Sequence, residues 1–339
     1  MFDKLYEKIK RFIKENYKEI IFLAILLFLV NYKLNYSIMV SGGTININDR
    51  VKIDNETISK GSFNLSYVTE LNGTIPTVLL SYVIPSWTKV DLNDYKTSTK
   101  ETAEDIEMRS KVYLEHSIQS AVKVAYDKAN KSFNYDDYKF YVVDVDEKAE
   151  TGLKVGDILL KVNGKVINTM NEYRNEVQTH NYGDTLNLVV ERGQTEKKVD
   201  VKVKNIDGQK LTGITILELY DYYTDPKIDI EFKKSESGPS GGLMLALSIY
   251  DKLTNYDLTN GLKIVGTGTI DFDGNVGEID GIEYKLKGAV KSKADVFIAP
   301  TGKNYQDAVK LKKKKNYKIK IIEAKTFDQV LEELKNINN

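Results

Sequence analysis

Apolar and polar residues follow three different patterns in the first part of the chain. Residues 20–30 (IIFLAILLFLV) form an uninterrupted apolar run. Residues 38–98 alternate β-branched or aromatic residues with polar ones between Gly, Asn and Pro, which predicts short strands. Residues 100–129 place apolar residues at helical spacing. We therefore expect an apolar N-terminal segment, then a β-rich region over residues 37–130 that ends in a helix packed on the following domains.

The apolar run follows a lysine-rich stretch, residues 1–19. A membrane-spanning helix usually needs about 20 residues, and Tyr32, Leu34 and Tyr36 extend the run towards that length. The sequence therefore predicts a cytoplasmic tail over residues 1–19, a single transmembrane anchor over residues 20–36, and a location outside the cell membrane for the rest of the chain. The alternative is a cleaved signal peptide, although the chain lacks a small-residue cleavage pattern after the apolar run.

From Tyr138 to about Lys204 the pattern predicts a small domain of strands with one helix. A strand-like segment (YVVDV) leads into a glycine-containing turn, and further strands flank a helix near residues 171–178. The run AETGLKVGDILLKVNG, from Ala149 to Gly164, resembles that of a bacterial PDZ domain.

This resemblance implies that residues 131–206 capture an extended peptide by adding it as a strand to their sheet. The strand that pairs with the peptide would contain Phe140, Tyr141 and Val142. The helix facing it would lie near residues 173–177.

The last region, residues 207–339, alternates predicted strands and helices, which indicates an α/β or α+β domain. A Gly-Pro-Ser-Gly-Gly turn at residues 238–242 leads into a predicted helix from Leu243 to Leu253. The serine of this turn, Ser240, fits three kinds of nucleophile: that of α/β-hydrolases, that of trypsin-like proteases and that of Lon-type peptidases. The local pattern does not choose among them.

The first two kinds of enzyme use a histidine base, and the chain has 2 histidines. An α/β-hydrolase has its histidine after the serine, and none follows Ser240. His116 lies in a predicted helix and His180 in the PDZ-like region, so neither is placed as a triad base. The remaining candidate for the base is a lysine.

Helical periodicity distinguishes one lysine near residues 280–297. The apolar positions of the predicted helix are Ile282, Leu286, Ala289 and Val290. Lys285 falls on this face, whereas Lys287 and Lys291 lie on the opposite one. Burial can lower a lysine pKa from about 10.4 towards about 7–8, where the amine accepts a proton at neutral pH. Periodicity alone leaves open the alternative that Lys285 extends from a half-buried helix to water.

Three motifs together resemble the proteolytic domain of Lon peptidases, which use a Ser–Lys dyad: the GPSGG turn, the GTGTID strand and the glycine-containing approach to Lys285. The resemblance implies that Ser240 is the nucleophile, Lys285 the general base and Thr267 a hydroxyl that orients the lysine. Gly238 and Gly241 would support the turn, and amides around Ser240 and Gly241 would form the oxyanion hole. The chain departs from the family at Gly241, which is more often Ala, and at Ser237, which replaces an acid of the ATP-dependent enzymes.

In layout the chain resembles the membrane-anchored Lon-like PDZ proteases of bacteria. The expected fold class is α+β, with an N-terminal transmembrane helix, a mainly-β segment, a PDZ domain and a Lon-type α/β proteolytic domain. The resemblance implies exported peptides or proteins as substrates and a possible homo-oligomer, a hexamer.

The amino-acid composition limits the kinds of partner and cofactor that we expect. The 49 basic and 49 acidic residues balance, which argues against nucleic acid. Without cysteine and with 2 histidines, the sequence predicts no metal site and no cofactor. The Gly-Lys pairs at residues 164–165 and 302–303 lack the rest of a nucleotide-binding P-loop, so we expect ATP-independent activity.

The leading hypothesis is therefore an ATP-independent, membrane-anchored serine endopeptidase. Two alternatives stay open at this point. One is a catalytically inactive, membrane-anchored PDZ adaptor, and the other is a sensor that cleaves itself.

Overall fold

The computed structural model describes residues 2–54 and 56–337. The predicted cytoplasmic tail includes Met1, the β-rich region includes Asn55 and the proteolytic domain includes Asn338 and Asn339, and these four residues lie outside the described ones. The chain forms two compact units. The N-terminal unit comprises residues 1–41 and 69–95, and the main unit comprises residues 42–68 and 96–339.

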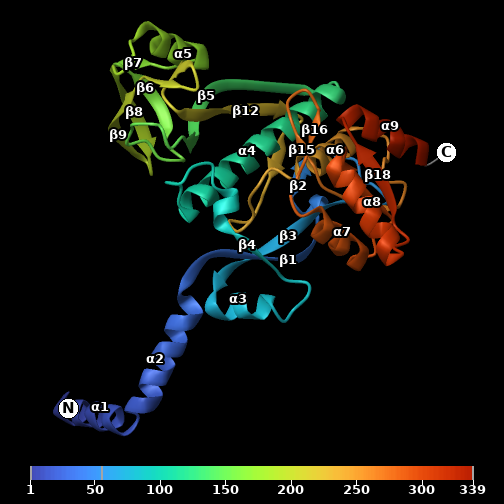
Figure 1. Ribbon diagram of the computed structural model, residues 1–339. Helices are drawn as coiled ribbons and strands as arrows, with labels where there is room; N and C mark the ends of the chain where they lie inside the picture. Colours follow the sequence, from blue (N-terminus) through green and yellow to red (C-terminus); the bar gives the residue numbers. More distant parts are fainter. Residues whose placement is uncertain (1, 55, 338–339) are drawn as a thin grey trace. The chain divides into compact units, whose positions relative to one another are not determined.

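The N-terminal unit contains two consecutive helices, followed by paired strands and a short helix (Figure 1). Its elements are α1 (Phe2–Glu15), α2 (Tyr17–Asn31), the start of β1 (Lys33–Asn46), the end of β3 (Ser62–Thr74), α3 (Ile75–Ser81), β4 (Thr88–Asp91) and the 3-10 turn η2 (Leu92–Tyr95). β4 pairs antiparallel with β1, so that Tyr36 lies opposite Asp91 and Met39 opposite Thr88.

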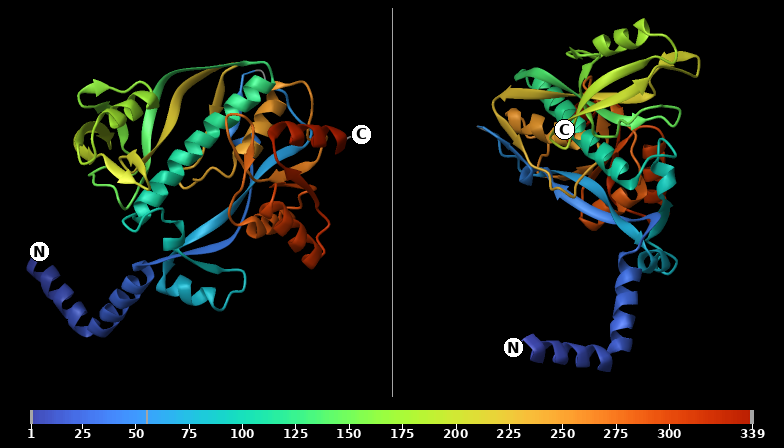
Figure 2. Two further views of the ribbon diagram at one scale, coloured as in Figure 1. Left: turned by 45° about the horizontal axis from the view of Figure 1, so that its top comes forward. Right: turned by 90° about the vertical axis from the view of Figure 1, so that its left-hand side faces the viewer.

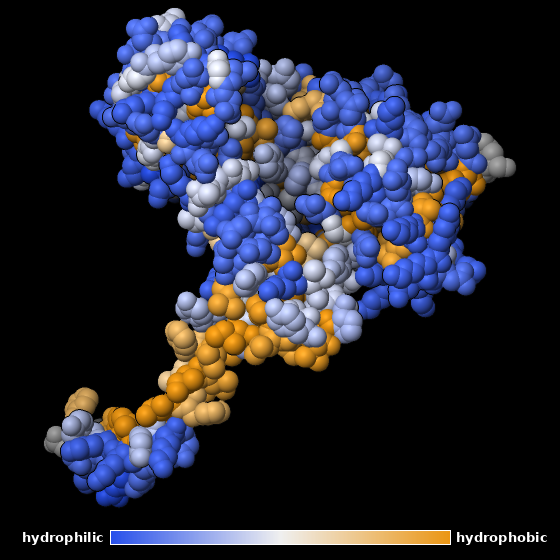
Figure 3. Space-filling model, viewed as in Figure 1, coloured by the Kyte–Doolittle hydropathy of each residue, from blue (hydrophilic) through white to orange (hydrophobic). Residues whose placement is uncertain are grey.

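The structure overturns the expected transmembrane helix over residues 20–36. α2 has 15 residues and ends at Asn31, and the chain continues as strand β1 from Lys33. Within residues 2–54 and 56–337, no helix combines the length and the apolar character that crossing a membrane requires. α2 nevertheless exposes apolar side chains along its length (Figure 3). The expected location of the later domains outside the cell membrane stays a prediction.

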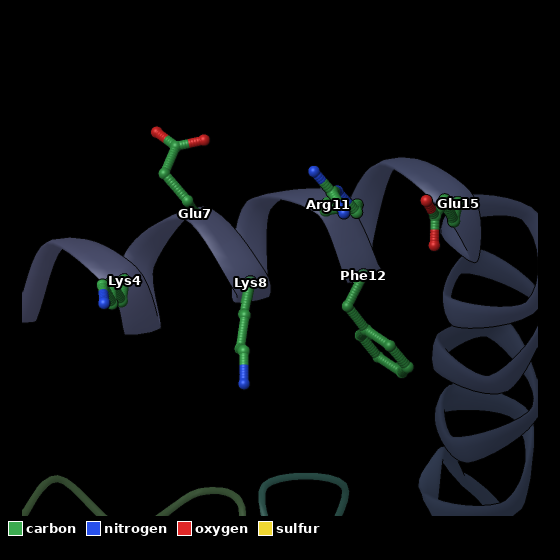
Figure 4. A pocket seen from close by; sticks show the side chains of 6 residues that line it. All are labelled: Lys4, Glu7, Lys8, Arg11, Phe12 and Glu15. Carbon is green, nitrogen blue, oxygen red and sulfur yellow. The ribbon is translucent and has the colours of Figure 1, made fainter.

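α1 has a surface hollow of about 480 Å³ that is lined by its own side chains alone. These are Lys4, Glu7, Lys8, Arg11, Phe12 and Glu15. They leave one helix in different directions (Figure 4), so they do not converge on a common point as the groups of a binding site do.

The main unit begins with short elements and the long helix α4. These are η1 (Ile47–Asp49), β2 (Val51–Ile53), the first part of β3 and α4 (Ala103–Lys128). The N-terminus of α4 is fixed because Thr102 and Asp105 bond each other's backbone N–H in a capping box. The helix predicted over residues 100–129 is therefore confirmed. The segment predicted as short strands contains two long ones, β1 and β3, and the helix α3.

The PDZ-like region is a sheet with the strand order β12-β5-β6-β8-β9, covered by helix α5. Its elements are β5 (Ser132–Val145), β6 (Ile158–Val162), β7 (Lys165–Val166), α5 (Met170–Thr179), β8 (Thr185–Arg192), β9 (Thr195–Lys202), the hairpin β10 (Lys204–Ile206) and β11 (Gln209–Leu211), and β12 (Ile214–Asp225). The predicted strands and helix are present, and β12 adds a strand that we did not assign to this sheet.

β5 and β12 form an antiparallel ribbon with two apolar faces. Successive side chains of a strand point to opposite sides. Val142 and Ile216 therefore pack into the core of the PDZ-like region, whereas Leu219 packs with Val112 of α4 on the other side. Figures 1 and 2 show α4 running alongside this ribbon.

The C-terminal part is a parallel sheet, β18-β17-β14-β3, with helices on both faces. Its elements are β13 (Ile228–Ile230), α6 (Gly242–Leu253), β14 (Lys263–Gly266), β15 (Thr269–Ile270), β16 (Val276–Gly277), α7 (Ile282–Lys291), β17 (Val296–Pro300), α8 (Lys303–Lys315), β18 (Lys320–Ala324) and α9 (Phe327–Ile337). Ile264 of β14 packs in one core with α4, α6 and α9, and its neighbour Val265 packs in another with α7 and α8. The sheet thus separates α6 from α7.

Candidate active site

The N-terminal ends of α6 and α7 approach the carboxyl end of β14 from opposite faces of the sheet. Ser240 lies two residues before the start of α6, Lys285 lies in the first turn of α7, and Thr267 follows the last residue of β14. In open parallel sheets, functional groups gather at this end of the strands. Three segments that are distant in the sequence therefore converge there.

Thr267 links the serine turn to the lysine through its hydroxyl group. Lys285 Nζ donates a hydrogen bond to Thr267 Oγ1 over 3.1 Å. Thr267 Oγ1 in turn donates to the backbone oxygen of Ser240 over 2.9 Å. The same oxygen accepts the N–H of Gly268 over 2.8 Å. The structure thus brings together the three residues that the sequence motifs grouped.

Lys285 is buried, as helical periodicity predicted, with 4% of its surface exposed. Burial lowers its pKa to about 8, and the negative charge of Asp280 opposes part of that effect. Lys287 is partly exposed and forms an ion pair with Glu283 instead. Of these two lysines, Lys285 has the environment that a general base requires.

Some backbone amides of the serine turn donate hydrogen bonds within the described part of the protein, and two others do not. Gly242 N–H donates to the oxygen of Pro239, and Leu243 N–H donates to the oxygen of Gly268. Among the described residues, the amides of Ser240 and Gly241 have no hydrogen-bond acceptor. These two amides stand at the positive end of the buried helix α6 and can bind an oxyanion.

Helix α4, outside the peptidase motifs, also holds the serine turn. Ser117 Oγ donates to the oxygen of Pro239 over 2.9 Å. The N–H of Gly238, a residue with φ of 88°, donates to the oxygen of Ser110 over 3.0 Å. Sequence reasoning missed both serines, because nothing near them in the sequence marks them. A Cβ at Gly242 would lie 2.4 Å from Ser117 Oγ, so the contact also requires glycine.

The two histidines have other partners than the serine turn. His116 of α4 packs edge-on against Phe272, and burial lowers its pKa. His180 caps α5 and its Nδ1 pairs with the oxygen of Glu176. Within the described residues, neither is hydrogen-bonded to Ser240.

The structure corrects the predicted peptide-binding strand. Phe140, Tyr141 and Val142 all pair with β12 on one side, and Phe140 and Tyr141 pair with β6 on the other. Val142 meets the segment before β6 through two backbone hydrogen bonds, with Gly156 and Asp157. Both edges of β5 are therefore occupied, and these residues have no backbone groups left for a peptide.

In the described part of the chain this sheet ends at β12 on one side and at β9 on the other, where Thr151 already bridges to Val201 of β9. The edge beside α5 is that of β12. α5 stands beside the segment that leads into it. Tyr173 Oη and Thr212 Oγ1 are 2.9 Å apart, and Gln178 Nε2 donates to the oxygen of Lys210. A strand added to the sheet would therefore pair with β12, beside the helix that we expected.

Two family models match the chain. A model of the PDZ domain matches residues 130–203. A model of the Lon protease (S16) C-terminal proteolytic domain matches residues 221–336. Most of β12 lies between the two matches. No curated protein matches this chain.

Solved structures of PDZ domains are similar to a part of the chain. One, from an SdrC-like protein of Listeria monocytogenes, is 24% identical with a TM-score of 0.22, and the match covers 25% of this chain and 90% of that one. Another, from an SdrC-like protein of Listeria innocua, is 26% identical with a TM-score of 0.22, and covers 24% and 92%. At these TM-scores the assignment of the domains rests on the family models.

Proposed function

We propose that this chain, which combines a PDZ domain with a Lon-type proteolytic domain, is an ATP-independent endopeptidase that cleaves peptides and flexible protein segments. Ser240 acts as the nucleophile and Lys285 as the general base. The observation that carries this proposal is the chain of hydrogen bonds from buried Lys285 through Thr267 to the backbone of Ser240.

The proposed reaction has two halves. Neutral Lys285 accepts the proton of Ser240 Oγ as this oxygen attacks the carbonyl carbon of the scissile bond. The amides of Ser240 and Gly241 bind the oxyanion, and Lys285 then protonates the leaving amine, which gives an acyl-enzyme. Water hydrolyses the ester and restores Ser240. Thr267 accepts a hydrogen bond from Lys285, which orients the amine.

Substrate capture takes place at the open edge of β12. An extended segment adds there as a strand, and its main-chain groups supply the affinity. The sequence contains no P-loop for an ATP-driven unfolding motor. Folded proteins should therefore resist cleavage, and exported peptides, which we expected from the sequence, would supply unstructured substrate.

Activity assays of variants test the dyad. We expect Ser240→Ala and Lys285→Met each to lower kcat/KM for fluorogenic peptides by about 10³-fold or more. Lys287→Met is the matched control, because this lysine is on the same helix but outside the site, and it should retain nearly full activity. Wild-type activity in both dyad variants would refute the proposal.

A phosphonate reagent separates the peptidase from an inactive adaptor. It should label Ser240 in the wild-type protein and lose that labelling in Lys285→Met. A protein that binds peptide at β12 but never reacts with the phosphonate would be an adaptor.

A further inference from the structure

The side chain of Gln119, on helix α4, pairs with the edge of β12. Tyr220 N–H donates to Gln119 Oε1 over 2.9 Å, and Gln119 Nε2 donates to the oxygen of Tyr220 over 3.0 Å. Gln119 has 2% of its surface exposed. Its carboxamide thus makes with Tyr220 the two bonds that a residue of a neighbouring antiparallel strand would make.

These two bonds reveal which backbone groups of β12 face outward. In an antiparallel pair, the N–H and C=O of one residue point to the same side, and the side alternates along the strand. Pairing with β5 is unbroken from Ile216 to Tyr220. Because Tyr220 faces away from β5, Glu218 and Ile216 face away from it too.

The partner of Ile216 supports this assignment independently. Ile216 lies opposite Val142, and both backbone groups of Val142 are bonded to residues on the other side of β5. Ile216 therefore has no backbone bond with Val142, which leaves its own N–H and C=O on the open side. The outward groups along β12 are those of Ile216 and Glu218, followed by those of Tyr220, which Gln119 occupies.

We propose that Gln119 is a specificity-determining residue that ends strand addition on β12. A bound segment pairs with Ile216 and Glu218, and it cannot extend the ladder to Tyr220 because the carboxamide already fills that place. This inference rests on the proposed capture of substrate at the same edge. It sets a maximum length for the part of the substrate that is held as a strand.

The place where Gln119 ends strand addition, which we call the stop, connects substrate capture to cleavage. Gln119 is two residues from Ser117, which bonds the oxygen of Pro239 beside Ser240. A substrate that leaves the ladder at Tyr220 therefore meets the helix that holds the serine turn. The fixed stop keeps the residues beyond it unpaired and available to the dyad.

Peptide length is the variable that tests the stop. The probes are synthetic alternating Thr-Val peptides of about four, six and eight residues, a range that matches short strands, each with two added lysines for solubility. Their affinities are measured with full-length Ser240→Ala protein, so that no peptide is cleaved. On this background we compare Gln119→Ala with Gln178→Ala, which removes another glutamine that bonds a backbone oxygen near β12.

For the protein with Gln119, we expect the affinity to stop rising once a peptide covers Ile216 and Glu218. Gln119→Ala should bind the shortest peptide equally well and the longest about ten- to a hundredfold more tightly, because two more backbone hydrogen bonds become available. Gln178→Ala should show no gain with length. If Gln119→Ala does not fold, Gln119→Met, which keeps most of the side-chain volume, takes its place.

Three outcomes separate the ideas. Equal changes in affinity for short and long peptides would mean that Gln119 has a structural role only, and would overturn the stop. The proposal would also be overturned if affinity kept rising with peptide length in the protein that retains Gln119. If no peptide binds at any length although Ser240 reacts with a phosphonate, capture at β12 fails and the stop falls with it.

Discussion

The proposed catalytic centre and the proposed capture edge on β12 differ in the kind of surface that each would offer to a substrate. At the centre, Lys285, Thr267 and the serine turn are bonded to one another and packed between buried helices. At the edge, the groups on offer belong to the backbone of Ile216 and Glu218. Activity should therefore depend on single side-chain atoms of the centre. Peptide affinity at the edge should instead tolerate new side chains and depend on changes of the backbone. Four predictions test this difference.

The largest effect should come from Lys285→Arg, which keeps the positive charge but removes the base. Arginine holds its proton at any pH that the protein tolerates, so we expect kcat/KM to fall by about 10³-fold or more. Lys291→Arg, on the exposed side of the same helix, is the control. Substantial activity in Lys285→Arg would mean that charge alone is sufficient.

Two neighbouring glycines should differ strongly in their tolerance of alanine. A Cβ at Gly242 would lie 2.4 Å from Ser117 Oγ and 3.2 Å from the amide nitrogen of Ile270, whereas one at Gly241 meets only the side chain of Leu65. Gly242→Ala should lower the free energy of unfolding by about 1–3 kcal/mol, and Gly241→Ala should change it little. Denaturant unfolding measures both, and equal losses would contradict the packing argument.

The pH dependence should also separate the two regions. Lys285 must be neutral to act, and its pKa is about 8. Below that value kcat/KM should rise about tenfold per pH unit, and it should level off above it. Peptide affinity of the Ser240→Ala variant uses backbone groups and should stay nearly constant over the same range. A flat activity profile would show that Lys285 is not the base.

The smallest effect should appear at the edge, in a comparison of two substitutions of Glu218. Glu218→Ala changes only the side chain and should leave peptide affinity within about twofold. Glu218→Pro removes an outward N–H, which an edge strand tolerates, and should weaken binding by about three- to tenfold through one lost hydrogen bond. Equal affinities would mean that the peptide does not pair with β12.

Local patterns predicted the burial of Lys285 and the position of the turn at Ser240, whereas the catalytic roles of these residues stay a proposal. The burial of Lys285 follows from its place among Ile282, Leu286 and Ala289, all within one short helix. The turn at Ser240 is likewise marked by its own Gly-Pro-Ser-Gly-Gly residues. The contribution of Ser110 and Ser117 could not be predicted, because it depends on how α4 packs against a turn far along the chain.

Two other predictions failed for identifiable reasons. The anchor over residues 20–36 added Tyr32, Leu34 and Tyr36 to a helix, although their alternation with polar residues has the period of a strand, and β1 begins at Lys33. The peptide-binding strand was placed in β5 from the resemblance to PDZ domains, and β12 was not assigned to this sheet. Which of them lies at the edge is decided by pairing between distant segments, which no local pattern contains.

The two-faced ribbon of β5 and β12 has a consequence for anyone who isolates the PDZ domain. A fragment that ends at residue 203, the limit of the family match, would lose β12 and leave β5 as a bare edge with apolar residues on both sides. Bare edges of this kind join to one another and cause aggregation. A soluble, independently folded module should therefore include β12 through Asp225 and a polar replacement for the apolar surface that α4 covers.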